Sequence, residues 1–227
     1  MPNILSIDTA TTLCSVSIFN EHTTLALEEV ERKNSHSEVI TLLIEAATKK
    51  AKIALKDLDA VAVSAGPGSY TGLRIGASAA KAICYTFNIP LIAYNTLKNI
   101  AFGIKKNDDL SKYDIFGSAI DARREEIYIS LYNMKGENIY KPKNIILTEN
   151  IFLELFSTKK IVLSGDGPNK VLKYHKKCNI IIDQISNSQS NNLTKEVIYQ
   201  YKNQEFVEFS LFEPNYIKPF YTTNRKN

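Results

Sequence analysis

The first twenty residues carry the alternation of apolar and polar positions that is typical of β-strands. An apolar run at residues 4–7 leads into a polar turn at 8–12, and residues 13–19 then alternate between apolar side chains and serines. Two strands separated by so short a polar segment form a hairpin. The pattern therefore predicts an antiparallel pair at the start of the chain.

The same pattern returns 113 positions later, where residues 119–133 align with residues 6–20 without a gap. Four positions are identical, among them Asp8, which corresponds to Asp121 in the second copy. The apolar positions keep the same phase in both copies. Internal similarity of this kind is typical of a duplicated structural unit, so we expect two related lobes.

Each half of the chain then shows the pattern of a hairpin, a third strand, a helix, a strand and a helix. Residues 35–38 resemble a capping box that opens the first helix. A strand, helix and strand of these lengths predict a parallel pair joined by a right-handed crossover. After the hairpins we expect a helix at 37–50, a strand at 60–63, a helix at 72–87 and a strand at 90–94 in the first half, and a strand at 144–147, a helix at 149–156, a strand at 161–163, a helix at 169–177, a strand at 179–183 and a helix at 193–201 in the second. A polar, charged stretch at 105–112 divides the lobes, which we expect at residues 1–108 and 109–227.

The composition is that of a folded globular protein, with 44% hydrophobic and 23% charged residues. The formal net charge of +4 is too small for a protein that binds nucleic acid by itself, although it allows an anionic partner. The apolar stretches are too short to span a bilayer and the N-terminus lacks a signal sequence, so we expect a cytoplasmic protein with no membrane contact. Cys14, Cys84 and Cys178 lie far apart without a C-x-x-C motif and are expected to be reduced thiols.

The glycine-rich segment GPGSYTGLRIG at residues 66–76 joins an apolar strand to a helix. α/β folds place ligand-binding loops at this position, and the first N–H groups of a helix bind anions. The segment lacks the features of a Walker A loop, a dinucleotide fingerprint and a nucleophile elbow. Two interpretations therefore stand: the glycines form a tight turn and allow close helix packing, or the loop faces an anion through Ser69, Thr71 and Arg74.

The three histidines do not favour a metal site, because no two of His22, His36 and His175 lie within four residues of each other. His36 is expected at the exposed start of a helix, and His175 on a solvated helix face. The sequence therefore predicts neither metal ligands nor a catalytic histidine.

Four motifs carry a family resemblance: ILSIDT at 4–9, GPGSYTGLRIG at 66–76, Pro90 followed by Thr-Leu at 96–97, and DAR with EIY within 121–128. Their order and spacing resemble the TsaB family, also called YeaZ. The resemblance covers residues 1 to about 135, and beyond that only residues 165–167 and 214–216 are similar. The family's terminal Tyr-x-Arg stands in this chain as Tyr216-Ile217-Lys218.

The resemblance implies an α/β, actin-like and sugar-kinase-like (ASKHA) fold, with two related lobes that each hold a mixed sheet flanked by helices. It implies a non-catalytic partner of TsaD in the synthesis of N6-threonylcarbamoyladenosine (t6A) at position 37 of tRNAs that read codons beginning with A. In the family, TsaC makes the threonylcarbamoyl adenylate, TsaE joins the pair, and tRNA is reached through the complex. No cofactor is expected to bind tightly, and ATP or ADP is expected only at the interface with TsaD.

The resemblance also implies that the helices at 37–50 and 72–87 form the surface that pairs with TsaD, or with a second copy when the chain is alone. Gly76 and Ala80 are one turn apart and would let a partner helix approach closely, whereas Leu73 and Ile83 are expected to face the sheet. An alternative is that the first helix of the same lobe covers this face. The expected interface residues are Val39, Leu43, Ala47, Gly72, Gly76, Ala79, Ala80 and Ile83.

Asp8 and Asp121 occupy the hairpin turns where actin-like kinases place an aspartate that faces magnesium or phosphate. Such kinases have glycines beside it, and this chain has none there, so we expect each aspartate to bind the N–H groups of its own turn. Asp8 is kept as a candidate for facing an anion. Two rival functions remain, a self-sufficient ATP-dependent kinase of this fold and a glycoprotease-like peptidase, and the missing glycines and the missing histidine pair H-x-x-x-H count against them.

Overall fold

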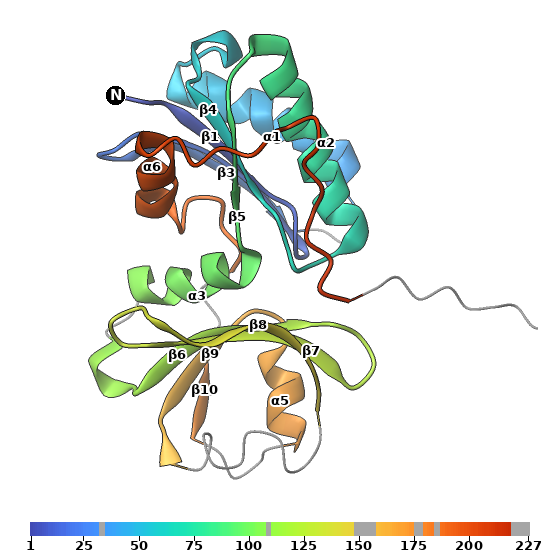
Figure 1. The fold of residues 1–227 in the computed structure, drawn as a ribbon, viewed down its shortest axis with the longest axis vertical. Coiled ribbons are helices and arrows are strands. Elements are labelled where there is room, and N and C mark those ends of the chain that lie inside the picture. Colours follow the sequence, from blue (N-terminus) through green and yellow to red (C-terminus); the bar gives the residue numbers. More distant parts are fainter. Residues whose placement is uncertain (32–34, 108–109, 148–157, 175–178, 184–186, 219–227) are drawn as a thin grey trace, which may run out of the picture.

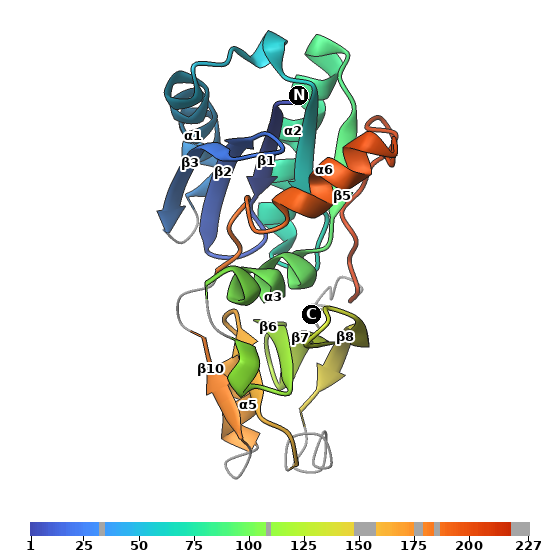
Figure 2. The same cartoon turned by 90° about the vertical axis from the view of Figure 1, so that its left-hand side faces the viewer.

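The computed structural model describes residues 1–31, 35–107, 110–147, 158–174, 179–183 and 187–218. Two lobes, each built on a five-stranded sheet, lie one above the other with a helix between them (Figure 1). A view turned by 90° shows the last helix and the C-terminal segment against the first lobe (Figure 2). The chain is therefore an α/β protein of two lobes, as the sequence predicts.

The sheet of the first lobe has the strand order β3-β2-β1-β4-β5. Its strands are β1 (Ile4–Asp8), β2 (Leu13–Phe19), β3 (Thr24–Glu31), β4 (Ala60–Ser64) and β5 (Leu91–Tyr94). β1 and β2 are antiparallel, whereas β1, β4 and β5 run parallel to one another. The predicted hairpin and parallel strands are confirmed. β1, β2 and β4 are buried along their whole length, because both faces of the sheet are covered.

Two helices, α1 (His36–Ala51) and α2 (Tyr70–Phe87), pack on the same face of this sheet. α1 begins where the sequence predicts, but Ser35 makes no side-chain capping hydrogen bond, so the expected capping box is wrong in this detail. Both helices end at a residue in the left-handed conformation, Lys52 (φ 57°) and Asn88 (φ 51°). A short 3-10 helix, η1 (Leu55–Asp57), precedes β4.

The sheet of the second lobe has the order β8-β7-β6-β9-β10, which repeats the first sheet strand for strand. Its strands are β6 (Ile115–Asp121), β7 (Glu126–Asn133), β8 (Asn138–Ile146), β9 (Ile161–Ser164) and β10 (Ile180–Ile182), preceded by η2 (Leu110–Lys112), with α5 (Pro168–Tyr174) between β9 and β10. The duplication expected from residues 6–20 and 119–133 is confirmed. The helix expected at 149–156, His175 and Cys178 lie outside the described residues.

Two helices each pack on the sheet of the lobe opposite to the one that they follow in the chain. α3 (Thr96–Asn107) follows the first sheet in the chain but packs on the second, where Ala101 and Ile104 contact Phe116. α6 (Thr194–Lys202) follows the second sheet but packs on the first, where Val197 contacts Ile92. α3 is not among the helices expected from the sequence. The expected second lobe, residues 109–227, does not hold all of its described residues, because α6 and the chain as far as Asn215 lie on the first lobe.

No helix in the described part of the chain is long and apolar enough to cross a bilayer.

Candidate functional site

The glycine-rich loop is a tight turn that holds the start of α2 against the end of β1. Gly66 has φ +107°, and a Cβ atom there would lie 2.6 Å from the carbonyl oxygen of Asn215. The N–H of Ser69 donates to the carbonyl of Ala10 at 2.7 Å, and the Ser69 hydroxyl accepts from the N–H of Gly72 at 3.2 Å. These contacts confirm the tight-turn interpretation and place Ser69 as the N-cap of α2.

The small residues of α2 face the sheet. A Cβ atom at Gly72 would collide with the carbonyl oxygen of Thr9, and one at Gly76 with its hydroxyl. Ala80 is 0% exposed in the core of the first lobe. The expectation that Gly76 and Ala80 face a partner is therefore wrong, because close approach to β1 requires the small side chains on this side.

The remaining expected interface residues divide between core and surface. Leu43, Ala47 and Ile83 are buried in the same core as Ala80, so they also cannot meet a partner in this conformation. Val39 and Ala79 are half-buried and pack against the same core. The role of the two helices as an interface stays a prediction, and it now concerns their outer faces.

A groove of about 660 Å³ runs between the N-terminal halves of α1 and α2. Its lining combines apolar side chains with small polar ones and one cation: Ser37, Ile40, Tyr70, Thr71, Arg74, Ile75, Ser78 and Ala79. Thr71 and Arg74, two of the residues expected to face an anion, thus lie in one surface hollow with exposed side chains. Ser69 is exposed one residue before the helix.

Arg74 is held by two aromatic rings at the groove. Its guanidinium carbon lies 4.2 Å from the ring centre of Tyr70 and 5.9 Å from that of Tyr216. Its Nε–H donates to the hydroxyl oxygen of Tyr216 at 3.1 Å. The two rings are 4.8 Å apart. Cation–π contact and the hydrogen bond together restrict a side chain that would otherwise move freely in solvent.

Asp8 is enclosed in the first lobe. One carboxylate oxygen accepts from the N–H of Ala10 at 3.0 Å, and the other accepts from Asn99 at 2.9 Å and from the hydroxyl of Ser188 at 2.6 Å. Burial raises the pKa of Asp8 to about 6, against the opposing effect of these donors. The expected turn contact is confirmed, whereas the alternative that Asp8 faces an anion is corrected, because the carboxylate is 0% exposed.

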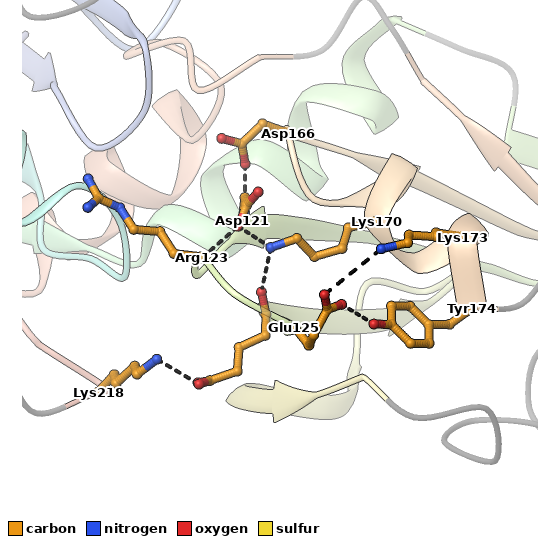
Figure 3. Close-up of polar contacts among 9 residues, drawn as sticks. Asp121, Arg123, Glu125, Asp166, Lys170, Lys173, Tyr174 and Lys218 are labelled. Atoms are coloured by element: carbon orange, nitrogen blue, oxygen red, sulfur yellow. Dashed lines mark hydrogen bonds and ion pairs between the residues drawn. The ribbon is translucent and has the colours of Figure 1, made fainter. Parts of the chain in front are cut away.

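Asp121 occupies the matching turn of the second lobe, at the centre of a network of charges (Figure 3). Its carboxylate accepts from the N–H of Arg123 at 2.6 Å and forms an ion pair with Lys170, while its own N–H donates to Asp166 at 2.8 Å. Burial raises the pKa of Asp166. Arg123 adopts φ 63°, which the aspartate contact supports. The contacts of the Asp121 carboxylate therefore stabilise the hairpin turn.

Lys218, where the resembling family has arginine, lies between the lobes. Its ammonium donates to a carboxylate oxygen of Glu126 at 2.7 Å, and the two side chains are only 16% and 14% exposed (Figure 3). The Lys218 contact, with that of Asn144, lowers the pKa of Glu126. A basic group at this position therefore links the C-terminal segment to the second lobe.

His36 departs from its expected exposure. The side chain is 7% exposed at the start of α1, and its Nε2 has no hydrogen-bond partner among the described residues. Within those residues, no three His, Cys, Asp or Glu side chains form a group that could hold a metal ion.

Sequence reasoning missed the residues that hold the expected ones in place. Ser188 and Asn99, which bind Asp8, come from distant segments and carry no pattern of their own. Tyr70 and Tyr216, which hold Arg74, are separated by 146 positions and meet only in the fold. The Tyr216-Ile217-Lys218 motif was the one available signal, and nothing in it pointed to Arg74.

Comparison with known proteins identifies relatives over much of the chain. Residues 28–207 match the family model described as TsaD, tRNA N6-adenosine threonylcarbamoyltransferase. The tRNA threonylcarbamoyladenosine biosynthesis protein TsaB of Bacillus subtilis is 30% identical over 69% of this chain, and the match spans 66% of that protein's length, slightly under two thirds. The protein of the same name from Buchnera aphidicola subsp. Baizongia pistaciae is 30% identical over 76% of this chain and 80% of its own length.

Solved structures agree on the fold. YeaZ from Pseudomonas aeruginosa superimposes with a TM-score of 0.77 at 22% identity, covering 95% of this chain and all of that one. An activator of 2-hydroxyisocaproyl-CoA dehydratase from Clostridium difficile, solved with bound ADPNP, gives a TM-score of 0.54 at 8% identity, covering 89% of this chain and 97% of that one. The expected actin-like, two-lobed ASKHA fold is confirmed.

Proposed function

We propose that this chain, which belongs to the TsaB (YeaZ) family of tRNA threonylcarbamoyladenosine biosynthesis proteins, is a non-catalytic partner of TsaD. The pair makes t6A at position 37 of tRNAs that read codons beginning with A. TsaD carries the chemistry of threonylcarbamoyl transfer, TsaE joins the pair, and tRNA is met through the complex. Without TsaD the same surface pairs two copies of this chain. ATP or ADP binds only where the two proteins meet.

The outer face of α1 and α2 carries this proposal. Leu42 on α1 is 61% exposed and Tyr85 on α2 is 79% exposed, and the groove with its apolar side chains Ile40 and Ile75 lies between the two helices. Large apolar side chains left exposed on a pair of packed helices are typical of a protein interface. The face is therefore suited to receive helices of a partner.

The contacts of the two hairpin-turn aspartates support a non-catalytic role. The Asp8 carboxylate is enclosed by Asn99 and Ser188, and the Asp121 carboxylate is paired with Lys170. The Asp8 carboxylate is inaccessible to a substrate in this conformation, whereas the Asp121 side chain is 40% exposed and its carboxylate is engaged by Lys170. We therefore expect the chain alone to hydrolyse no ATP at a useful rate and to retain no stoichiometric metal, which nucleotide turnover and metal analysis of the purified protein would check.

Binding of purified TsaD to the purified chain tests the interface. We compare the wild type with Leu42→Glu by calorimetry and by size-exclusion chromatography with light scattering. A glutamate in place of a leucine that the partner covers loses apolar contact and desolvates a charge, which together lower the affinity by about 100-fold or more. The same variant is expected to lower t6A formation by the chain reconstituted with TsaC, TsaD and TsaE.

Ile146→Glu is the matched control, because Ile146 is also 61% exposed but lies on β8 of the second lobe. It should leave both the affinity for TsaD and t6A formation unchanged. Failure of the wild-type chain to bind TsaD would refute the proposal, and equal losses in the two variants would place the interface elsewhere.

A further inference from the structure

The C-terminal segment from Val207 to Lys218, termed here the strap, is fastened along the first lobe. Val207 pairs with the edge of β5 through a hydrogen bond from its N–H to the carbonyl of Leu91 at 2.9 Å. Lys81 of α2 donates to two strap carbonyls, at residues 210 and 212. The strap then follows the first lobe toward the second, as the red trace shows (Figures 1 and 2).

Tyr216 is fixed from both sides within the strap. On one side, the N–H of Asn215 donates to the carbonyl of Ala65, beside the glycine-rich loop, at 2.6 Å. On the other, Lys218 forms its largely buried ion pair with Glu126 of the second lobe at 2.7 Å. Glu126 also accepts from Asn144 at 2.6 Å, so the carboxylate is itself oriented. The position of Tyr216 thus depends on both lobes.

Tyr216 in turn orients Arg74. The hydrogen bond to the Tyr216 hydroxyl uses the Nε–H of the guanidinium, and Tyr70 stacks on its face. The two Nη groups form the edge with which a guanidinium binds a carboxylate through two parallel hydrogen bonds. None of the ion pairs between described residues includes Arg74. Arg74 therefore lies in the groove as an oriented cation that forms no ion pair with a described residue, although the charge of Glu213 acts on it from beyond ion-pair distance.

We propose that Arg74 receives a carboxylate of the docking protein, and that the strap is the element that positions it, through Tyr216 at the groove and Lys218 at the second lobe. The ligand is a protein side chain, because the half-buried Ile75 and Ala79 flank the cation with apolar surface that a protein covers. The inference rests on the proposed function for the identity of that protein. Arg74 binds the carboxylate, and Tyr216 and Lys218 are positioning residues.

A double-mutant cycle between positions 74 and 216 tests the pair. We measure the affinity for purified TsaD by calorimetry with the wild type, Tyr216→Phe, Arg74→Lys and the double variant. Tyr216→Phe keeps the ring and removes the hydrogen-bond acceptor, which frees the rotamers of Arg74 and lowers the affinity about 10-fold. In the double variant this loss disappears, because a lysine has no Nε–H to orient. Additive losses would overturn the proposal while leaving the TsaD interface intact.

A second measurement needs no partner. The Nε–H resonance of Arg74 in ¹⁵N NMR spectra, assigned by its absence in Arg74→Lys, should exchange slowly with water in the wild type and rapidly in Tyr216→Phe. Lys218→Met should also speed this exchange and weaken TsaD binding, and an unchanged resonance and affinity would overturn the role of the second lobe. Tyr199→Phe, at an exposed tyrosine of α6, is the control and should change nothing. If the wild type fails to bind TsaD, the proposed function fails, and the exchange rates still decide whether the strap orients Arg74.

Discussion

Replacing Asp8 with asparagine tests whether burial holds a proton on this carboxyl group. The carboxylate is 0% exposed, and its pKa in the folded chain is about 6, compared with 3.8 for the ordinary group. Between these two pH values the folded chain keeps a proton that the unfolded chain has released. The free energy of unfolding therefore falls as the pH rises through this window, and the contribution of the proton is fully present only below it.

The size of the effect follows from the difference between the two pKa values. About two pH units, at about 1.4 kcal/mol for each, give a full contribution of about 3 kcal/mol, of which the wild type loses about 2.4 kcal/mol between pH 4 and pH 7. The asparagine side chain of the variant carries no titratable proton to lose. It disturbs the hydrogen bond from Asn99, but that cost of about 1–2 kcal/mol does not change with pH. The difference between the two proteins isolates the ionisation of Asp8.

The assay is urea unfolding of the wild type and Asp8→Asn at closely spaced pH values from 4 to 7, followed by tyrosine fluorescence and circular dichroism. The variant should gain about 2.4 kcal/mol relative to the wild type across this range. In ¹³C NMR spectra the Asp8 carboxyl, assigned through the variant, should titrate near pH 6. Ser188→Ala should move that midpoint upward, because the Ser188 hydroxyl lowers the pKa of Asp8. A difference in stability that stays constant with pH, or a carboxyl that titrates below pH 4.5, would refute the reasoning.

Three further predictions follow from burial in the first lobe. Ala80→Arg places an unpaired charge in the core and should destabilise the fold by several kcal/mol or prevent folding, whereas Ala82→Arg, at an exposed position of α2, should change stability by less than about 0.5 kcal/mol in the same urea unfolding experiment. Gly72→Ala forces a Cβ atom against the carbonyl of Thr9 and should lower the free energy of unfolding by about 1–3 kcal/mol. Ser78→Ala, on the exposed side of α2, is the control. Equal melting temperatures of the two variants would contradict the packing of α2 on β1. Burial raises the pKa of Cys14 and of Cys84 to about 12. In a Cys178→Ser variant, neither thiol should therefore react with a thiol reagent at pH 8 until the chain unfolds. Rapid reaction of the native protein would show that the core opens.

Local pattern determined most of the elements and the repeat. The alternation at residues 4–19 predicts β1 and β2, the apolar run at 60–63 predicts β4, and the spacing within 72–87 predicts α2, which the structure extends by two residues at its start. The offset between Asp8 and Asp121 predicts the duplication that the two sheets display in identical strand order. The strands and helices depend on residues within a few positions along the chain, and the duplication is visible as a repeated pattern. Both can therefore be predicted from the sequence alone.

One element was missed although its pattern was present. α3 has apolar residues at 97, 100, 101 and 104, a helical spacing, but they lie next to the charged stretch that marks the lobe boundary. Its buried face packs on the sheet of the other lobe, where Phe116 covers it. The sequence could have predicted the helix, but only the fold decided that α3 and α6 each cover the sheet of the opposite lobe.

Which side of α2 faces the sheet was decided by tertiary packing. Apolar and small residues run almost all the way round this helix, so its pattern does not distinguish the two sides. The turn after β1 lies so close to α2 that Cβ atoms at Gly72 and Gly76 would collide with Thr9, and this close approach selects the small residues for the sheet side. The meeting of Tyr216 with Arg74, and of Lys218 with Glu126, has the same origin. Contacts between residues more than ninety positions apart depend on the path of the whole chain, and a single sequence holds no local signal for them.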